Sequence, residues 1–490
     1  MAVSKLNLGA WRPIGDAKGG GNACLPTHHL VTHAAIFGMT GSGKTGLLTV
    51  IAEEALREGV PTLMLDVKGD LPNLLLSFPG FDPGDLTPWV ESAAVGEEKS
   101  VTQIALEQNE TRKRALLAWS IGEGELKKYA EKVDFRVITP GSSAGELLHV
   151  LSSLERRSDR WDKDPESARD ALSAAVSLVL RLLGRDPDPA KSREHVLLSV
   201  LAEQRLRNGE AASLGDLLKD LANPPIEKVG ALDVDSFLPK SERKSLAAAL
   251  NTLLASPTFA SWREGATLDI GEWLKPKNGR TPAVIVSVAH LDDEERALVL
   301  GVLLEEVLSW VRSLPGSSRL KALLVFDEVY GFLPPHPANP PTKRPLVALM
   351  KQARAFGVGV VVATQNPMDV DYRALGNAGV WCIGRLQTDA DCARVLDGLA
   401  STGINGFSTA ELGAVVKNLA PRWFLMRDVH ARVGTILLQP RWAMSLLRGP
   451  MTRNEIKQAL DMRRLMFPSK SQLPLPKPVV AEGTTTSTNG

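Results

Sequence analysis

One stretch of ten residues, 36–45, restricts the fold of this chain more than any other and reads IFGMTGSGKT. It fits the pattern G-x-x-x-x-G-K-[ST], whose glycines let the backbone turn tightly and point successive N–H groups at a polyphosphate. The lysine of such a loop reaches the β- and γ-phosphates, and the next hydroxyl binds Mg²⁺. The stretch therefore predicts a P-loop for ATP and Mg²⁺. The predicted nucleotide contacts are Gly38, Thr40, Gly41, Ser42, Gly43, Lys44, Thr45 and Gly46, and Thr45 would also bind the metal.

The segments on either side of this loop agree with the prediction. Residues 32–37 (THAAIF) are apolar and suited to a strand, and residues 46–56 have the apolar spacing of a buried helix. The alternative is a chance glycine-rich turn. A strand before the loop and a helix after it are the context that the motif requires, so we favour the P-loop.

Composition sets wider limits. The chain has 490 residues, of which 44% are hydrophobic and 23% charged, as in globular proteins with one large α/β domain and a smaller one, or two to three domains. The formal net charge of +1 gives no support to bulk nucleic-acid binding, although a local basic channel would be compatible. The three cysteines, Cys24, Cys382 and Cys392, are too few for a disulfide framework and fit a reducing cytoplasm.

Neither a signal peptide nor a membrane span is expected. The first residues, MAVSKLN, lack the apolar core of a signal peptide. Residues 283–304 are largely apolar, but the charged run DDEER at 292–296 interrupts them. We therefore expect a cytoplasmic protein with no membrane insertion.

Buried-strand and helix patterns alternate along the chain and predict an α/β fold with a mostly parallel sheet. The strands are expected at 61–66, 135–139, 282–288, 320–326, 358–363 and 380–384, with a late hairpin from 423–426 and 435–438. Helices are expected at 168–184, 193–208, 214–221 and 241–254. The predicted division is an irregular N-terminal segment (1–30), an ATPase core (31–150 and 276–440), a large helical insertion (151–275), a C-terminal helical segment (441–468) and a disordered tail (469–490). The N-terminal segment could also supply a strand or a clip.

Three tryptophans, Trp161, Trp262 and Trp273, lie in or beside the helical insertion. They have two interpretations. Core or interdomain packing is the more ordinary one, and stacking on nucleic-acid bases is the more specific one.

A P-loop enzyme also needs an acidic element, and Asp327-Glu328 after an apolar strand supplies it. Asp327 would hold Mg²⁺, and Glu328 would polarise the water that attacks the γ-phosphate. The next strand ends at Gln365, whose amide would sense the γ-phosphate or orient the water. A helix N-terminal acid and a capping amide are the respective structural alternatives.

Four further residues are candidates. Asp66 and Lys68 follow the strand at 61–66, at the edge that faces ligands in such sheets, and would contact water on Mg²⁺ or phosphates. The alternative is that they only cap the loop. Arg354 and Arg385 would stabilise charge on the transferred phosphoryl group, in the same chain or across a subunit boundary, although a lone arginine is often a surface ion pair.

Together, the P-loop, residues 66–70 (DVKGD), 324–328 (LVFDE) and 363–365 (ATQ) resemble the HerA/FtsK superfamily of P-loop ATPases, with the HerA-like branch nearest. Residues 351–357 (KQARAFG) resemble its arginine-bearing helix, and residues 384–391 (GRLQTDAD) its strand-end arginine. The resemblance covers about residues 30–75 and 280–400, the catalytic core.

The resemblance implies a RecA-like fold, Asp327, Glu328 and Gln365 in the roles given above, and often a hexameric ring with ATP sites at subunit boundaries. Many members move double-stranded DNA, some assist end resection beside a nuclease or other effector protein, and others drive secretion or conjugation. Two departures stand out. Thirty residues before the P-loop strand cannot hold the N-terminal β-barrel of HerA, and the insertion at 151–275 is large for a translocase core.

Three functions are compatible with these motifs. The first is a DNA translocase or helicase motor, whose ATPase activity DNA should stimulate. The second is an ATPase that moves or remodels protein, which would need a protein or membrane partner. The third is a nucleotide-dependent switch or scaffold, and Glu328 argues against it because switches often lack that acid. We favour the motor.

Overall fold

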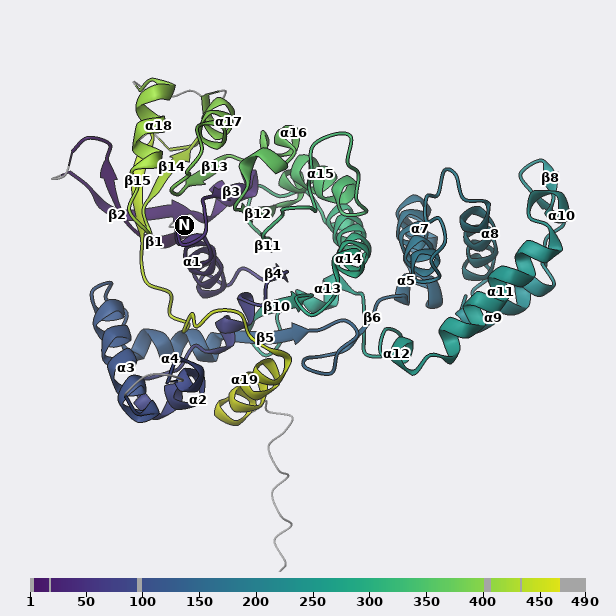
Figure 1. Cartoon of the computed structure of the whole chain (residues 1–490), viewed down its shortest axis with the longest axis horizontal. Helices are drawn as coiled ribbons and strands as arrows, with labels where there is room; N and C mark the ends of the chain where they lie inside the picture. The colour runs from purple at the N-terminus through teal and green to yellow at the C-terminus, as the bar shows by residue number, and fades with distance from the viewer. Residues whose placement is uncertain (1–3, 17–18, 95–98, 401–406, 432–433, 468–490) are drawn as a thin grey trace, which may run out of the picture.

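The computed structural model describes residues 4–16, 19–94, 99–400, 407–431 and 434–467. Among these residues, eleven strands form one sheet. They are β1 (Lys5–Pro13), β2 (Gly21–Pro26), β3 (Ala34–Phe37), β4 (Thr62–Asp66), β5 (Val133–Ile138), β10 (Thr281–Ser287), β11 (Ala322–Asp327), β12 (Val358–Thr364), β13 (Val380–Ile383), β14 (Phe424–Asp428) and β15 (Ile436–Pro440). Their order is β2-β1-β15-β14-β13-β3-β12-β11-β4-β10-β5 (Figure 1).

The sheet has a parallel part and an antiparallel part. All neighbours from β13 to β5 pair in parallel, whereas β14, β15, β1 and β2 add antiparallel strands beyond β13. The strands β3, β4, β10, β11 and β12 are buried along their whole length. Parallel strands covered on both faces read as continuous apolar runs, which is why the sequence predicted them. The predicted α/β fold with a mostly parallel sheet is confirmed.

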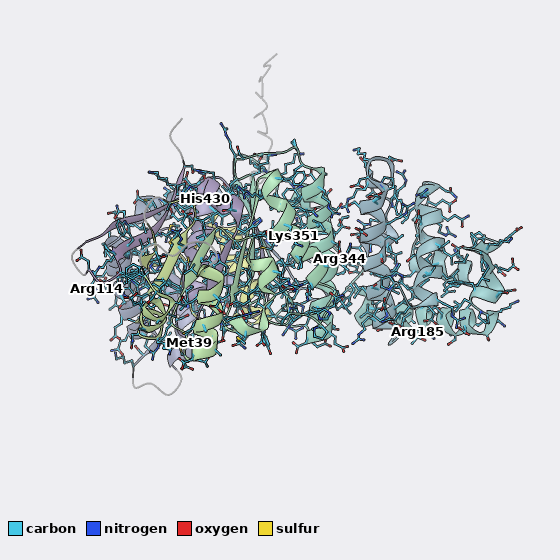
Figure 2. The ribbon with its side chains drawn as sticks, turned by 90° about the horizontal axis from the view of Figure 1, so that it is seen from above. Met39, Arg114, Arg185, Arg344, Lys351 and His430 are labelled. Atoms are coloured by element: carbon cyan, nitrogen blue, oxygen red, sulfur yellow. The ribbon has the colours of Figure 1, made fainter. Side chains whose placement is uncertain are left out.

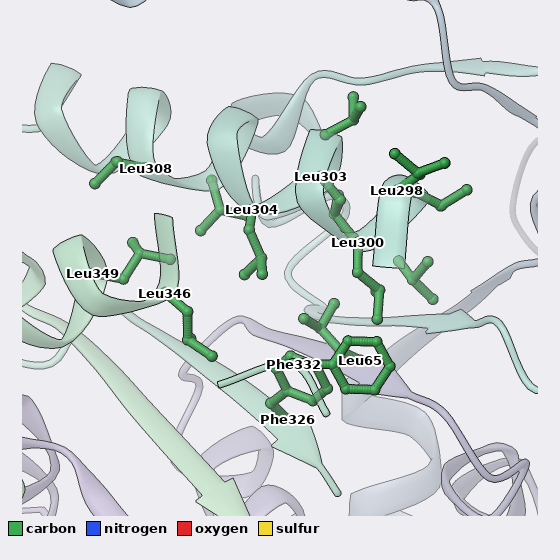
Figure 3. Packing of buried hydrophobic residues seen from close by; sticks show 14 of the residues in the cluster. Leu65, Leu298, Leu300, Leu303, Leu304, Leu308, Phe326, Phe332, Leu346 and Leu349 are labelled. Carbon is green, nitrogen blue, oxygen red and sulfur yellow. The ribbon is translucent and has the colours of Figure 1, made fainter. Parts of the chain in front are cut away.

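Helices cover both faces of the sheet. The helix α1 (Lys44–Arg57) packs on one face together with α2 (Pro83–Ala94), α3 (Val101–Leu117), α4 (Glu123–Lys132) and α19 (Arg453–Met466). On the other face, α14 (Asp293–Ser313) and α15 (Lys343–Gln352) pack against the strands. Figure 3 shows Leu300, Leu303 and Leu304 of α14 over Phe326 and Leu65 of the sheet. Smaller helices follow β12 and β13, namely α16 (Tyr372–Leu375), α17 (Asp389–Ala400) and α18 (Thr409–Lys417).

Between β5 and β10 the chain forms a helical arm that projects from the core, on the right of Figure 1. Its helices are α5 (Ser152–Glu155), α6 (Arg160–Lys163), α7 (Pro165–Leu182), α8 (Arg193–Arg207), α9 (Leu214–Ala222), α10 (Val234–Phe237), α11 (Lys240–Ala255), α12 (Pro257–Ala260) and α13 (Ile270–Trp273). The four helices predicted in this region correspond to α7, α8, α9 and α11. The arm joins the core through α7, where the hydroxyl of Ser167 hydrogen-bonds that of Ser309 on α14.

The three tryptophans of this region are core residues. Trp161, Trp262 and Trp273 are only 7%, 9% and 5% exposed. Such burial leaves no ring face for a nucleic-acid base. The packing interpretation is therefore correct, and the base-stacking interpretation is wrong.

The N-terminal segment differs from the prediction. Residues 1–30 were expected to be irregular, but β1 and β2 form an antiparallel hairpin, and β1 also pairs with β15. The side chains of Leu6 and Leu8 alternate inward from β1, which is the burial pattern of a strand. The glycine-rich run before β2 belongs to the turn of this hairpin, and it masked the alternation of buried and exposed residues in the sequence.

The predicted late hairpin, β14 with β15, is confirmed. The predicted disordered tail, 469–490, lies outside the described residues.

A buried charge cluster fastens the segment after β15 to α1. The guanidinium of Arg441 lies 2.9 Å from a carboxylate oxygen of Glu53 and 2.9 Å from one of Glu54, and the side chains of Arg441 and Glu53 are wholly buried. Glu53 also accepts hydrogen bonds from the backbone N–H groups of Met444 and Ser445, each at 2.9 Å. Every one of these charges thus has a partner, which a buried charge requires.

We expect Arg441→Ala to lower the free energy of unfolding by about 3–5 kcal/mol, because it leaves the buried carboxylate of Glu53 without its cation. The matched control is Arg464→Ala, since Arg464 and Asp461 form an exposed pair with 68% and 54% of their side chains accessible. That change should cost less than about 1 kcal/mol. Chemical denaturation would measure both, and equal losses would contradict the prediction.

Candidate nucleotide-binding site

The loop between β3 and α1 has the backbone of a phosphate-binding loop. Its glycines Gly38, Gly41 and Gly43 have φ angles of 154°, 78° and 95°. A Cβ atom on Gly38 would lie 2.6 Å from Oγ of Ser42, so glycine is required there. The hydroxyl oxygen of Ser42 is buried and has no hydrogen-bond partner among the described residues. An unsatisfied polar atom at this place fits a polar ligand such as a phosphate.

Lys44, the first residue of α1, bends its ammonium group back into this loop. The group donates hydrogen bonds to the carbonyl oxygens of Gly38 (2.6 Å) and Met39 (3.3 Å). Burial lowers the pKa of Lys44 to about 8, although the nearby carboxylate of Glu328 opposes the shift. A buried cation held by two carbonyl oxygens is ready to exchange them for phosphate oxygens.

The order of the strands brings the predicted sensor to this loop. Strand β12 lies between β3 and β11, so its end is next to both the loop and the acidic pair. The hydroxyl of Thr40 donates a hydrogen bond to the amide oxygen of Gln365 at 2.7 Å. Gln365 therefore contacts the P-loop directly.

Asp327 ends β11 and carries an unpartnered buried carboxylate oxygen, Oδ2, within the described structure. Burial, with the nearby carboxylates of Asp66, Asp70 and Glu328, raises its pKa to about 7. An orphaned carboxylate in such a place fits a divalent cation, which would neutralise it. Across the described residues, no three His, Cys, Asp or Glu side chains form a metal cluster. The predicted ligands, Thr45 and Asp327, would hold Mg²⁺ together with phosphate oxygens and water.

Glu328 is held by three hydrogen bonds in a strained conformation. Its φ angle is 62°, in the left-handed region that residues other than glycine rarely adopt. One carboxylate oxygen accepts from the hydroxyl of Thr364 and from the backbone N–H of Gln365, both at 3.1 Å. The other lies 2.7 Å from the ammonium group of Lys68. Lys68, predicted to contact phosphate, thus neutralises the predicted catalytic acid.

The hydrogen bonds of Asp66 favour the loop-capping alternative over the metal or phosphate role. One of its oxygens accepts from the backbone N–H groups of Gly69 (2.9 Å), Asp70 (3.0 Å) and Leu71 (3.3 Å). The other accepts from the hydroxyl of Ser287 at 2.7 Å. Burial raises the pKa of Asp66 to about 6. Because both oxygens are occupied, Asp66 shapes the loop that carries Lys68.

The two candidate arginines lie in different places. Arg385 follows β13, where its carbonyl oxygen accepts from the N–H of Met39 at 2.9 Å, and its exposed side chain is beside the P-loop. Arg354 lies in η3 (Ala353–Phe356), before β12 begins. The seven residues of β12 separate it from Gln365 by roughly 20 Å. A role for Arg354 in the site of its own chain is therefore excluded.

The surroundings of Arg354 agree with this placement. It lines a cavity of about 790 Å³ together with His28, His29, Lys351 and His430. Figure 2 shows Lys351 and His430 on the side of the core opposite Met39 of the P-loop. The cavity is thus at the amino-terminal edge of the sheet, away from the P-loop of the same chain.

Sequence reasoning missed Arg422, whose backbone hydrogen-bonds to the P-loop. Its backbone N–H donates to the carbonyl oxygen of Ser42 at 2.9 Å, and a Cβ atom on Gly43 would lie 3.1 Å from its Cγ. Its φ angle of 63° is again left-handed. Neither spacing nor a motif marks this residue, because its position depends on β14 pairing beside β13.

We expect Asp66→Asn to keep the fold and nucleotide binding nearly unchanged, because the amide oxygen can still accept from the loop and the amide N–H₂ can donate to Ser287. Asp66→Ala should lower the free energy of unfolding by about 2–4 kcal/mol, since the loop N–H groups lose their acceptor. Thermal denaturation and titration with ADP would measure these effects. Loss of binding in a stable Asp66→Asn protein would instead support a metal or phosphate role.

Known proteins resemble this chain in sequence and in fold. The family model described as "Helicase HerA, central domain" matches residues 14–307. The structure of VirB4 of Thermoanaerobacter pseudethanolicus has a TM-score of 0.50 at 14% identity, covering 89% of this chain and 98% of that one. Plasmid coupling protein TrwB in complex with ADP and Mg²⁺ has a TM-score of 0.47 at 15% identity, covering 92% and 99%. A search of curated proteins gave no match.

These findings agree with the geometry of the site. The likeness to VirB4 concerns the fold alone, because the identity is low. Within the described residues, no helix is long and apolar enough to cross a membrane. The family match spans more than half of the chain and includes the P-loop. The chain therefore belongs to the HerA central-domain family and has the RecA-like fold of its P-loop ATPases.

Proposed function

We propose that this protein hydrolyses ATP with Mg²⁺ and uses the energy to move along DNA or unwind it. The observation that carries the hydrolysis step is the meeting of the P-loop, Asp327, Glu328 and Gln365 at one edge of the sheet. Membership of a helicase family supports DNA as the substrate.

Each residue of the site has a distinct task in this proposal. Lys44 exchanges its two carbonyl partners for the β- and γ-phosphates. Mg²⁺, held by Thr45 and Asp327, would neutralise the phosphate charge. Glu328 accepts a proton from the attacking water, and Gln365 orients that water.

Glu328 must first leave its resting partners. The ammonium of Lys68 lies 2.7 Å from one of its carboxylate oxygens and occupies that oxygen. A γ-phosphate offers Lys68 a stronger anion, so we infer that Lys68 moves to the phosphate when ATP binds. Glu328 would then be free to act only when the nucleotide is in place.

We infer that the protein forms a head-to-tail ring, the hexamer that the family resemblance implies, because heterologous contacts that close generate rings. Such a ring would place Arg354 beside a nucleotide bound to another copy. In such a ring the amino-terminal edge of one sheet faces the ATP site of the next copy, and Arg354 would stabilise the transition state there. Phosphate tracking needs only a few Lys or Arg per subunit, which agrees with the net charge of +1. We place this motor in the cytoplasm, where a nuclease or other effector would share its DNA.

We expect ATPase activity to rise several-fold when duplex or single-stranded DNA is added. Lys44→Ala should abolish nucleotide binding, whereas Glu328→Gln should retain binding and lose hydrolysis by at least about a hundredfold. Phosphate release, with and without DNA, measures these rates.

If saturating DNA neither binds nor changes the rate, the DNA role fails. Co-purification with a protein partner would then favour protein remodelling. Tight ATP binding with background turnover would favour a switch.

Mixing two inactive variants tests the role of Arg354. Lys44→Ala removes the P-loop cation and Arg354→Ala removes the arginine at the opposite edge of the sheet. If the arginine serves the neighbouring copy, some sites in a mixed ring combine an intact P-loop with an intact Arg354. We therefore expect measurable ATPase activity in the mixture and almost none in either variant alone. An inactive mixture, with ring formation verified by mass measurement, would exclude a role across the subunit boundary.

A further inference from the structure

The side chain of Arg422 connects the P-loop to an exposed aromatic ring. Its guanidinium carbon lies 3.7 Å from the centre of the Trp442 ring, a close cation–π contact. One guanidinium nitrogen also donates to the carbonyl oxygen of Pro440 at 2.9 Å, which fixes the group over the ring. We call these two side chains the Arg422–Trp442 stack. Through the backbone bond from Arg422 to Ser42, the stack begins at the phosphate loop itself.

The side chain of Trp442 is exposed, although hydrogen bonds hold its backbone in place. It is 46% exposed, although its neighbours in the sequence are anchored to the P-loop helix. Arg441 bonds to Glu53 and Glu54 of α1 and also donates to the carbonyl oxygen of Trp442 at 2.7 Å. The ring therefore keeps a fixed position relative to α1 while leaving much of its surface uncovered.

Space for a ligand group is present beside the ring. Trp442 forms one wall of a cavity of about 370 Å³, with Thr111 and Arg112 of α3 and Leu447 among the other lining residues. This volume is in the range of small-molecule sites. At the start of α1, a Cβ atom on Gly46 would meet nothing within 4 Å, so the space beside this residue is open.

We propose that the Arg422–Trp442 stack is the platform for the base of the bound nucleotide. Planar rings and guanidinium groups stack on the π-face of any purine, and such contacts tolerate different bases. The strained left-handed backbone at Arg422 has a role in this arrangement, because it lets one residue bond the phosphate loop and cover the ring. The platform rests on the proposed nucleotide-binding function and adds to it a site that recognises the base rather than the phosphates. ATP and GTP should both use it.

Comparing ADP with inorganic tripolyphosphate, which has no base, separates this site from the P-loop. Isothermal titration calorimetry of the full chain with Mg²⁺ should give about a tenfold weaker Kd for ADP in Trp442→Ala, the loss expected for one stacking contact. The Kd for tripolyphosphate should change less than about twofold. GDP should weaken as ADP does, and Trp442→Phe should stay close to the unmodified protein in every titration.

Two further variants make the result unambiguous. Trp442→Leu keeps an apolar side chain without an aromatic face, and should lose ADP affinity as Trp442→Ala does. Trp310→Ala removes a half-buried tryptophan of α14 on the other face of the sheet and should change neither ligand. Unchanged ADP affinity in the Trp442 variants, or an equal loss for tripolyphosphate, would overturn the base platform. An unmodified protein that binds neither ligand would instead refute the proposed function.

Discussion

The site depends on where one strand pairs. Strand β12 is inserted in parallel between β3 and β11, with Val361 opposite Ala34 on one side and opposite Val325 on the other. Parallel strands end at a common edge, so the loop after β3, the amide after β12 and the acids after β11 become neighbours. The pairing is backed by full burial of β12 on both faces. The site combines segments that are far apart in the chain, so its geometry depends on this register. A slip of one residue would turn every side chain of β12 to the opposite face of the sheet.

At that edge of the sheet several charged side chains are buried close together, so the position of each depends on its partners. Lys44 is held by loop carbonyl oxygens, Glu328 by Lys68, and Asp327 has an oxygen without a partner. Buried ions are stable only with partners, so the free loop satisfies most of its groups internally and leaves Asp327 with a raised pKa. In the proposed function, a nucleotide with its metal would offer phosphate oxygens to Lys44 and a cation to Asp327, the one of the three that lacks a partner. Binding therefore exchanges one set of ion pairs for another, which explains how a site can be buried and still be ready for a highly charged ligand.

The sequence predicted the order of the elements better than the contacts of single side chains. Runs such as 358–363 identify strands because both faces are buried, and the P-loop and Asp327 carry their chemistry in local patterns. The hairpin of β1 and β2 was missed because a glycine-rich turn masks its alternation. Asp66 and Arg354 show a different limit, because spacing places both beside strands but does not give their contacts. In the folded chain Asp66 bonds to its own loop and to Ser287 of β10, and Arg354 lies at the edge of the sheet opposite the P-loop. Arg422 had no local signal at all.

The family match and the geometry cover different halves of the site. The matched residues, 14–307, include the P-loop and end within α14, before Asp327, Glu328 and Gln365. A phosphate-binding loop alone would serve a switch as well as an enzyme, because it binds a nucleotide without providing a base. The proposed hydrolysis therefore depends on residues beyond the match, and these meet the loop through two hydrogen bonds, Thr40 with Gln365 and Gln365 with Glu328. Those two hydrogen bonds form one chain from the phosphate loop to the predicted catalytic acid, so they are the direct path by which the proposed site could couple nucleotide occupancy to Glu328.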